Sequence, residues 1–435
     1  MKKIIGVRKE DKNIWERRTP IIPEHIGMLI RDNDLDFIVQ PSNIRAFSNK
    51  EYEHYGAKIS DDLSLCDFIF GVKEVPKELI LKEKTYIFFA HVIKGQKYNM
   101  PMLKTILEKN CTLIDYERIV DKQNKRLVFF GYQAGQAGFM DGMWALGQRL
   151  DWEDMPNPFS RFRPAHTYLN LNEFEKDLEI VSEKIEEGEI PEEISPVVVG
   201  IAGYGHVSQG VQSLLNQLPF VEITPKELLN LKENSFSKYK IYKVVFKEED
   251  MVEPINPKKK FDLQDYYDNP KNYKSIFNRY LPHLTILFNC IYWDQRYPRL
   301  VAKEDIKNLW KEGKPNLRVL ADISCDVEGA IEVNVRTTTP GNPIYVWNVD
   351  DEKTYDGFAG KGPIVLAVDN LPCELPKESS TFFSRILLPF IPEIANCNWD
   401  LSFENLNLSY PLKKAVIVHK GELTPEYKYL ERSLL

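Results

Sequence analysis

The sequence predicts an α/β protein built on parallel sheets, and three observations carry this prediction. Short runs rich in β-branched and aromatic residues alternate with helix-like stretches from the N-terminus onward, at the spacing of βαβ units. In the middle of the chain an apolar run passes through glycines directly into an amphipathic stretch, and apolar runs resume beyond residue 284. A chain of 435 residues, of which 43% are hydrophobic, has room for about two to three domains.

The first third of the chain carries five strand-like runs, and a helix opens near Pro23. The predicted strands are Lys3–Val7, Asp36–Val39, Asp67–Phe70, Tyr86–Phe89 and Thr112–Asp115. Ligands collect at the carboxyl ends of strands in such sheets. Lys73 and His91 follow two of these strands, and Arg18 lies in the loop after the first. Three basic groups at one edge predict a site for an anionic substrate.

A glycine-rich helix is predicted next. Gly131, Gly135, Gly138 and Gly142 are spaced four, three and four residues apart, so they share one face of a helix. Each glycine in a helix interior costs about 1 kcal/mol relative to alanine, so a very close approach must require them. Two compatible explanations are tight helix packing across a domain joint and a place beside a bound substrate or cofactor.

The stretch from Pro196 to Gly210 predicts a dinucleotide site. An apolar strand turns at glycines into a helix expected over His206–Leu218, and a pyrophosphate binds the positive end of such a helix. A second strand, Phe220–Thr224, follows about twenty residues on. Ser208 replaces the third glycine of the fingerprint, so an ordinary glycine-rich turn is the alternative. The expected cofactor contacts in this loop are Gly203, Tyr204, Gly205, His206, Val207 and Ser208.

The remaining segments carry less chemistry. Residues 173–193 predict a solvated helix and a connector, and residues 226–280, dense in lysine, acids and tyrosine, are read as an elaboration. Leu284–Trp293 and Arg318–Asp326 predict two more strands of the nucleotide sheet. A strand, a turn and a helix start follow in Gly362–Ser379, which periodicity does not assign to either domain.

Composition excludes several classes of function. The net charge of −7 argues against nucleic-acid binding, which requires a basic face. The six cysteines include no CxxC pair and have no histidine-rich neighbourhood, which favours free thiols in a reducing compartment and no metal site. The N-terminus shows no signal peptide, and no apolar run approaches the roughly eighteen residues of a membrane span. We therefore expect a cytoplasmic protein without membrane contact.

Several segments together resemble a known family. They include FFAHVIKGQ (88–96), GYGHVSQG (203–210), NCIYWDQRYPRL (289–300), ADISCDVEGAIE (321–332) and AVDNLPCELPKESS (367–380). In order, up to about residue 394, they resemble the lysine–ketoglutarate reductase half of the bifunctional aminoadipic semialdehyde synthases. More distantly, the pattern resembles lysine-forming saccharopine dehydrogenases and alanine dehydrogenase.

The resemblance implies two Rossmann-like domains, with the dinucleotide-binding domain (141–339) inserted into a substrate domain (1–140 and 340–435). It also implies a reaction: L-lysine and 2-oxoglutarate condense to an imine, which a nicotinamide cofactor reduces to saccharopine, or the reverse. The chain ends where a synthase would begin its second enzyme. We therefore expect a stand-alone reductase linked to a separate saccharopine-oxidising enzyme, and the sequence leaves a homo-oligomer open.

The resemblance also assigns roles to residues. Lys73 and His91 match the catalytic positions, and both suit proton transfer near neutral pH if burial and cationic neighbours lower the lysine pKa. Arg18 matches an arginine that holds a substrate carboxylate, which a guanidinium binds bidentately. Its neighbour Arg17 is the alternative. Arg126 is a second carboxylate candidate.

Four acids complete the expected site. Glu16 either receives an ammonium group of the substrate or is a solvated loop acid. Asp326 matches an aspartate near the nicotinamide in alanine dehydrogenase-like enzymes, whereas Asp322 either contacts the cofactor or is structural. NAD specificity usually needs an acid at the end of the second strand. Glu222 in that role favours NAD, whereas Thr224 with Lys226 favours NADP, and the reductase resemblance favours NADP.

Two other functions stay open. One is another amino acid or opine dehydrogenase of the same superfamily, which would share Lys73 and His91. The other is a non-catalytic nucleotide-binding regulatory protein. A decayed enzyme is expected to have lost at least one of Lys73, His91, Arg18 and Asp326. All four are present, so catalysis is favoured.

Overall fold

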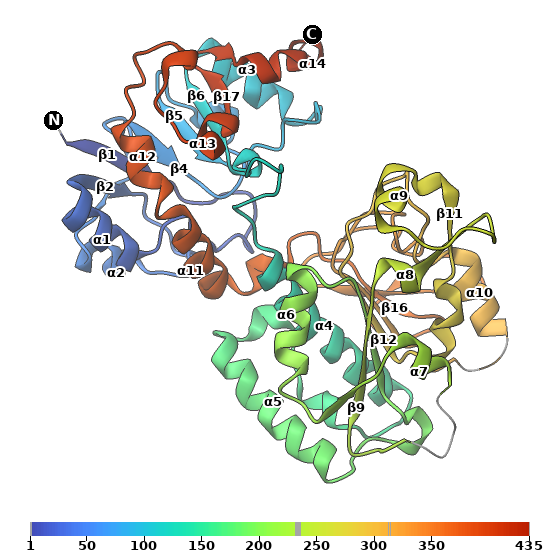
Figure 1. Cartoon of the computed structure of the whole chain (residues 1–435). Coiled ribbons are helices and arrows are strands. Elements are labelled where there is room, and N and C mark those ends of the chain that lie inside the picture. Colours follow the sequence, from blue (N-terminus) through green and yellow to red (C-terminus); the bar gives the residue numbers. More distant parts are fainter. Residues whose placement is uncertain (1, 231–235, 312, 314, 435) are drawn as a thin grey trace. The chain divides into compact units, whose positions relative to one another are not determined.

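The computed structural model describes residues 2–230, 236–311, 313 and 315–434, and Figure 1 traces the whole chain. The chain divides into two compact units. Unit 1 holds Met1–Phe130 and Pro376–Leu435, and unit 2 holds Gly131–Leu375. Residues 131–140 and 340–375, expected in the substrate domain, lie in unit 2. The reason is that the glycine-rich helix and three strands after residue 340 pack with the sheet of unit 2.

Unit 1 is built on an eight-stranded sheet, and its five predicted strands are confirmed. The strands are β1 (Lys3–Val7), β2 (Leu35–Val39), β3 (Lys58–Ile59), β4 (Phe68–Phe70), β5 (Thr85–Phe88), β6 (Thr112–Asp115), β17 (Val416–His419) and β18 (Glu422–Leu423). Their order is β18-β17-β6-β5-β4-β1-β2-β3. The strands from β6 to β3 pair in parallel, in the order 3-2-1-4-5-6 of doubly wound nucleotide folds. The last two strands join by antiparallel pairing.

Helices cover this sheet, and one of them supports the loop that carries Arg18. They are α1 (Pro23–Asn33), α2 (Asn49–His54), α3 (Met100–Glu108), α11 (Pro376–Leu387), α12 (Phe390–Asn396), α13 (Tyr410–Ala415) and α14 (Glu431–Leu434). Helix α1 begins at Pro23, where proline suits the first turn. In α11 the hydroxyls of Ser380 and Ser384 accept the backbone N–H groups of Thr19 and Ile22 at 2.9 and 3.1 Å. The C-terminal segment thus fixes the loop after β1.

Unit 2 is also built on an eight-stranded sheet. Its strands are β7 (Val198–Ala202), β8 (Phe220–Glu222), β9 (Ile241–Phe246), β12 (Ile286–Asn289), β13 (Val319–Asp322), β14 (Ile344–Trp347), β15 (Thr354–Asp356) and β16 (Ile364–Leu366). Their order is β15-β14-β16-β13-β12-β7-β9-β8. The strands from β16 to β8 are parallel, and β14 and β15 are antiparallel. Strand β9, which lies in the segment read as an elaboration, separates β8 from β7.

The other elements of unit 2 surround this sheet. They are α4 (Gly131–Trp152), α5 (Leu171–Glu186), α6 (His206–Leu215), α7 (Pro225–Leu229), α8 (Glu248–Met251), α9 (Leu263–Asp268), α10 (Lys303–Lys311), and a small sheet of β10 (Val252–Pro254) and β11 (Tyr273–Ser275). Helix α5 fills the acidic segment read as solvated, but it is amphipathic and buries Phe174, Leu178 and Val181.

The glycines of α4 are explained by packing inside unit 2. A Cβ on Gly135 would lie 1.9 Å from the Val207 carbonyl oxygen of α6, and one on Gly210 would lie 2.0 Å from the Tyr132 carbonyl oxygen. A Cβ on Gly142 would lie 2.7 Å from the Phe288 ring. The tight packing is therefore confirmed, but it joins α4 to α6 and to the sheet of its own unit.

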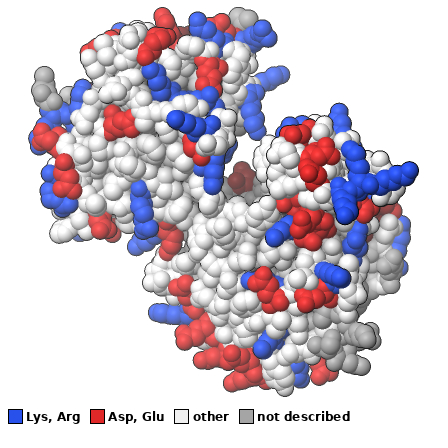
Figure 2. All heavy atoms as spheres, viewed as in Figure 1, with Lys and Arg blue, Asp and Glu red and all other residues white. Residues whose placement is uncertain are grey.

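Charge is distributed without a single-sign band on the visible face of the described residues, where acidic and basic side chains are interspersed (Figure 2). Within the described ranges, no helix has the length and apolar character that a membrane crossing requires. Cys66, Cys111, Cys373 and Cys397 are buried free thiols, and Cys290 and Cys325 are partly exposed.

Candidate functional site

The carboxyl edge of the unit 1 sheet holds a cluster of buried charges. The strand order reverses between β1 and β4, the kind of switch point at which α/β proteins bind ligands. Glu10 follows β1, and its carboxylate accepts the backbone N–H groups of Val72 and Lys73 at 2.7 and 3.0 Å. Burial raises the pKa of Glu10 to about 7, against the opposing charge of Arg8. Glu10, which sequence reasoning missed, thus fixes the backbone that presents Lys73.

Lys73 lies in a desolvated, positively charged environment. Burial lowers the pKa of its ammonium group, and the charge of Arg18 lowers it further, while Glu16 and Glu74 oppose the shift. A lysine whose pKa is lowered this way takes up and releases protons more readily near neutral pH.

His91 follows β5 and is held by an acid that sequence reasoning also missed. Its Nδ1 lies 2.6 Å from Oε1 of Glu74, whose other oxygen lies 3.2 Å from Nζ of Lys12. Burial opposes ionisation of Glu74, but the hydrogen bond and charge of His91 hold its pKa well below its usual value. The ionised carboxylate makes Nδ1 the proton-bearing nitrogen and leaves Nε2 for a substrate. The backbone of His91 has φ 48°, which Asn99 supports by donating to the His91 carbonyl at 3.2 Å.

Arg18, rather than Arg17, belongs to this cluster. The Arg18 guanidinium binds Glu16 bidentately, with Nε–Oε1 and Nη2–Oε2 distances of 2.7 and 2.6 Å, and it lies 4.4 Å from the centre of the Phe130 ring. Both charged side chains are buried. Arg17 donates instead to the Ile44 carbonyl oxygen at 3.3 Å. The carboxylate of Glu16, expected either to receive a substrate ammonium or to be solvated, is engaged by Arg18.

Arg126 has a different environment from Arg18. Its side chain is half-exposed and pairs with Glu117. A buried arginine beside an aromatic ring is the better carboxylate site, because its charge is less screened by water. The structure therefore favours Arg18 over Arg126.

The glycine loop of unit 2 leaves room for a pyrophosphate. Gly203 has φ 96°, which favours glycine, and its N–H donates to the Phe246 carbonyl oxygen at 2.9 Å. A Cβ on Gly205 would meet no atom within 4 Å among the described residues, so the space before α6 is open. Tyr204 and His206 are exposed, and Val207 is half-buried. Ser208 is buried and accepts a hydrogen bond from Gln212 at 2.9 Å, which directs its hydroxyl away from solvent.

The residues expected to bind the cofactor ribose lie on strand β8 or just after it, and β8 does not border β7, the strand that leads into the glycine loop. Strand β8 is at the sheet edge, where Glu222 pairs with Lys243 of β9 at 2.7 Å. Thr224 caps the N-terminus of α7 in a capping box with Glu227. Strand β7 is bordered by β12 on one side and by β9 on the other, so β9 stands between β7 and β8.

Strand β9 ends directly before Lys247 and Glu248. The Glu248 carboxylate accepts a hydrogen bond from the Tyr267 hydroxyl at 2.8 Å, and Tyr204 of the glycine loop bonds to Glu248 as well. The sequence signal for this strand is the mostly apolar run Ile241–Phe246, which is followed by Lys247 and three acids.

The two aspartates after β12 and β13 differ in burial. Asp322 is buried and accepts amide N–H groups from Asn289 and Asn334, each at 2.8 Å, and burial raises its pKa to about 6. It ties the ends of two strands to a loop, which favours the structural alternative. Asp326 is exposed in a turn, with its carbonyl oxygen accepting the Gly329 N–H at 2.9 Å. No group of three or more His, Cys, Asp or Glu side chains suited to a metal occurs among the described residues.

Comparison with known proteins places the chain in a family. Residues 6–137 match the alanine dehydrogenase/PNT N-terminal domain, and residues 291–426 match the corresponding C-terminal domain. Solved structures of an L-alanine dehydrogenase and of a transhydrogenase from Sinorhizobium meliloti share the fold, with TM-scores of 0.63 and 0.55. They are 15% and 12% identical and cover 99% and 98% of this chain and all of their own.

Closer sequence similarity links the chain to enzymes of lysine metabolism. Alpha-aminoadipic semialdehyde synthases of Arabidopsis thaliana and Bos taurus are 37% and 34% identical over 99% of this chain, which spans only 41% and 48% of their length. The saccharopine dehydrogenase [NAD(+), L-lysine-forming] of Candida albicans is 27% identical over 90% of this chain and 92% of its own. The chain belongs to the alanine dehydrogenase/PNT family and is homologous to the lysine–ketoglutarate reductase region of the synthases and to saccharopine dehydrogenases.

Proposed function

We propose that this chain is a nicotinamide-dependent lysine–ketoglutarate reductase, which joins L-lysine to 2-oxoglutarate and reduces the imine to saccharopine. The observation that carries the proposal is the charge cluster at the switch point of unit 1, where Glu74 links His91 to the environment of Lys73 and Arg18. The homologous synthases and saccharopine dehydrogenases support this choice of substrates.

In this proposal the charged groups of unit 1 bind the substrates and move protons. Arg18, held in place by Glu16, binds a carboxylate of 2-oxoglutarate. Lys73, whose pKa is lowered by burial, takes a proton from the amino group of the incoming lysine. His91 protonates the oxygen that leaves as water, through the Nε2 that Glu74 leaves available. The nicotinamide, when bound, supplies the hydride.

The chain's own residues fit a dinucleotide at the unit 2 loop. The turn at Gly203 and the open space over Gly205 let backbone N–H groups reach a pyrophosphate at the start of the ten-residue helix α6. Tyr204, His206 and Val207 border that space, while the buried Ser208 supports the helix. Asp326 stays the candidate for the nicotinamide end.

We favour NAD over NADP as the cofactor. The expectation of NADP rested partly on Thr224 and Lys226 at the end of β8, and β8 does not border β7. Glu248, just past the end of the bordering strand β9, supplies a carboxylate for the ribose 2′-hydroxyl, which would repel a 2′-phosphate. The homologue of Candida albicans is itself named for NAD(+).

The test is absorbance at the nicotinamide band with purified protein, L-lysine and 2-oxoglutarate, using NADH and NADPH in separate reactions. Oxidation that requires both substrates, and is faster with NADH, is the expected result. Oxidation with other amines or oxoacids but not with lysine and 2-oxoglutarate would indicate another amino acid or opine dehydrogenase. Cofactor binding without oxidation of any pair would indicate a regulatory nucleotide-binding protein and contradict the proposal.

A further inference from the structure

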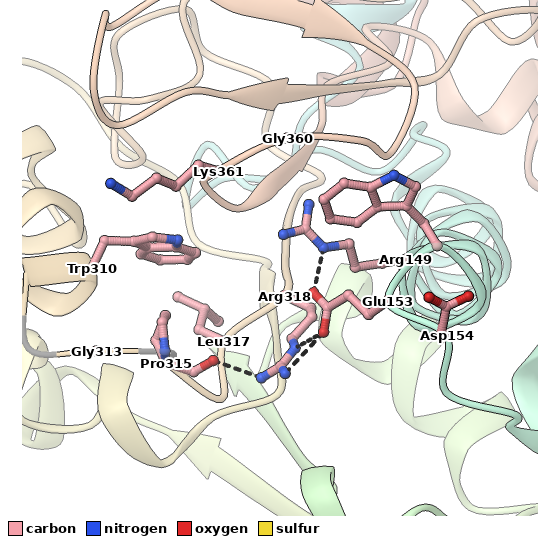
Figure 3. Close-up of a pocket in the computed structure, with 11 residues that line it drawn as sticks. Arg149, Glu153, Asp154, Trp310, Gly313, Pro315, Leu317, Arg318, Gly360 and Lys361 are labelled. Atoms are coloured by element: carbon pink, nitrogen blue, oxygen red, sulfur yellow. Dashed lines mark hydrogen bonds and ion pairs between the residues drawn. The ribbon is translucent and has the colours of Figure 1, made fainter.

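Unit 2 contains a second cavity, at the edge of its sheet opposite to the glycine loop. Figure 3 shows this cavity, which has a volume of about 640 Å³. Its walls come from the end of α4, the end of α10, the segment that enters β13 and the loop before β16. These segments meet the amino ends of the strands, whereas the glycine loop follows the carboxyl end of β7. The cavity therefore lies outside the proposed cofactor site.

Two buried arginines share one acid in the wall of this cavity. Arg149 Nε lies 2.6 Å from Glu153 Oε1, and Arg318 Nη2 lies 3.1 Å from Glu153 Oε2. Each arginine side chain is only 7% exposed. Burial lowers the pKa of Arg149, Glu153 opposes this shift, and the nearby charge of Arg318 adds to it. Arg149, Arg318 and Glu153 together carry a net charge of +1, and the charges of Lys361 and Asp154, which also line the cavity, cancel each other. A net positive lining attracts an anion.

A structural role alone does not account for the second arginine. One arginine paired with Glu153 would suffice to fasten α4 to the segment before β13. Besides Glu153, the Arg149 guanidinium donates to the Phe358 carbonyl oxygen at 3.0 Å. A guanidinium has five N–H groups, so three of those of Arg149 have no partner among the described residues. In Figure 3 its terminal nitrogens point away from Glu153, toward the side of Lys361 and Gly360.

Besides Asp154 and Lys361, the rest of the lining is mostly apolar and aromatic. Trp310 lies across from Arg149 in Figure 3, with Leu317 and Pro315 beneath it. Trp152 forms part of the lining, and its ring centre lies 4.7 Å from the Arg149 guanidinium. Flat aromatic groups pack well on such surfaces. The lining thus combines an anion-binding group with a place for a ring.

We propose that this cavity binds a small organic anion with a flat aromatic body, whose carboxylate or phosphate group contacts Arg149 and whose ring packs on Trp310. The site takes its ligand independently of the reaction proposed above. This cavity differs from the surroundings of Arg18, which is buried against a single phenylalanine ring, because it offers a place for both an anionic head group and an aromatic ring.

The test is calorimetric titration of the full chain with indole-3-acetate and with phenyl phosphate, which distinguish a carboxylate from a phosphate head. Acetate and indole-3-ethanol are the controls for the ring and for the charge. Each variant is titrated alongside the wild type. Arg149→Met leaves Glu153 paired with Arg318, so it removes the surplus charge without stranding the acid. Arg299→Met is the matched control, because Arg299 also pairs with a glutamate and lies 5.8 Å from a tryptophan ring, but outside this cavity.

We expect the wild type to bind at least one aromatic anion more tightly than either control compound. Arg149→Met weakens that binding at least about tenfold. Trp310→Leu also weakens it, whereas Arg299→Met has no effect. Binding of only one aromatic anion identifies the head group and supports the proposal. Failure of both to bind, or equal binding by the wild type and Arg149→Met, overturns it.

Discussion

The two sheets of this protein have the same make-up and a different order. Each has eight strands, of which six are parallel and two are added by antiparallel pairing. In unit 1 the second strand of the chain, β2, borders the first. In unit 2 the strand that borders β7 is the third, β9, and β8 lies at the edge. Chain order therefore matches the strand order next to the first strand in unit 1, but not in unit 2.

The two units also use their buried groups differently. In unit 1 acidic and basic side chains lie together at the switch point, and hydrogen bonds between them fix their orientation, as between Glu74 and His91. In unit 2 the loop that follows β7 is a backbone turn with open space, and the carboxylate of Glu248, just past the end of the neighbouring strand β9, bonds to Tyr204 of that loop. Under the proposed function, unit 1 carries the chemistry and unit 2 binds the cofactor, and four predictions test this division.

The largest effect is expected in unit 1, from His91. Asparagine tolerates the positive φ of this residue, so His91→Asn removes the imidazole with little backbone strain. Loss of a general acid–base lowers kcat/KM by about 10²–10⁴-fold, which steady-state NADH oxidation measures. Arg17→Met is the control, because its side chain faces a backbone carbonyl outside the cluster. A loss below about tenfold for His91→Asn would remove His91 from the mechanism.

The next effect distinguishes two kinds of glycine in unit 2. Gly135→Ala puts a Cβ 1.9 Å from a backbone oxygen of α6, so we expect a loss of about 3 kcal/mol or more in the free energy of unfolding. Gly205→Ala meets no described atom within 4 Å and should leave stability unchanged within about 0.5 kcal/mol, while raising the KM for the cofactor. Urea unfolding measures the stability of both variants, and steady-state kinetics measure their KM for the cofactor. Equal stability losses would contradict the assignment of Gly205 to a ligand.

The third prediction concerns strand order directly. If the acid after β9 binds the ribose, Glu248→Gln removes about 1–2 kcal/mol of binding energy and lowers kcat/KM with NADH roughly 5–30-fold. The ratio of kcat/KM with NADH to kcat/KM with NADPH falls as well. Glu222→Gln, on the edge strand, is the matched control and should change neither value. A larger effect at Glu222 than at Glu248 would return the ribose site to β8.

Much of this arrangement could be predicted from sequence, and the failures have physical reasons. Local periodicity locates the strands of unit 1 and the basic residues that follow them, because both depend on neighbouring residues. Strand pairing depends on distant residues, so nothing local shows that Ile241–Phe246 enters between two predicted strands. Glu10 and Glu74 resemble solvated loop acids in the sequence, and only the fold buries them against Lys73 and His91. The unit boundary near residue 375 cannot be predicted from the local sequence either, because only strand pairing shows that β14 and β16 belong to the sheet of unit 2.

The smallest expected effect compares the buried acids of the two units. Glu10 in unit 1 accepts two backbone N–H groups, whereas in unit 2 Asp141 of α4 adjoins Glu374 of the turn Leu371–Glu374. When both are ionised, Asp141 Oδ2 has no donor among the described residues, whereas the His166 backbone N–H favours the charged form of Glu374. A proton shared between the two carboxyl groups supplies the bond that the ionised pair lacks. Burial raises the pKa of Asp141 to about 6 and holds that of Glu374 well above its usual value.

The sign of the pH dependence follows from these raised values. Between the unfolded pKa values near 4 and the folded ones, the folded state binds more protons, so the stability from this pair is complete below about pH 4 and is lost as pH rises through 6 and beyond. Glu374→Gln replaces the shared proton with an amide donor. We expect it to stabilise the protein by about 1 kcal/mol at pH 8 relative to wild type, and to reduce the loss of stability between pH 5 and 8. Urea unfolding at both pH values measures this, with Glu222→Gln as an exposed-acid control. Parallel pH profiles of stability for the wild type and Glu374→Gln would show that Asp141 and Glu374 are both ionised in the folded protein. Unit 2 would then hold buried carboxylates without the backbone donors that Glu10 has in unit 1.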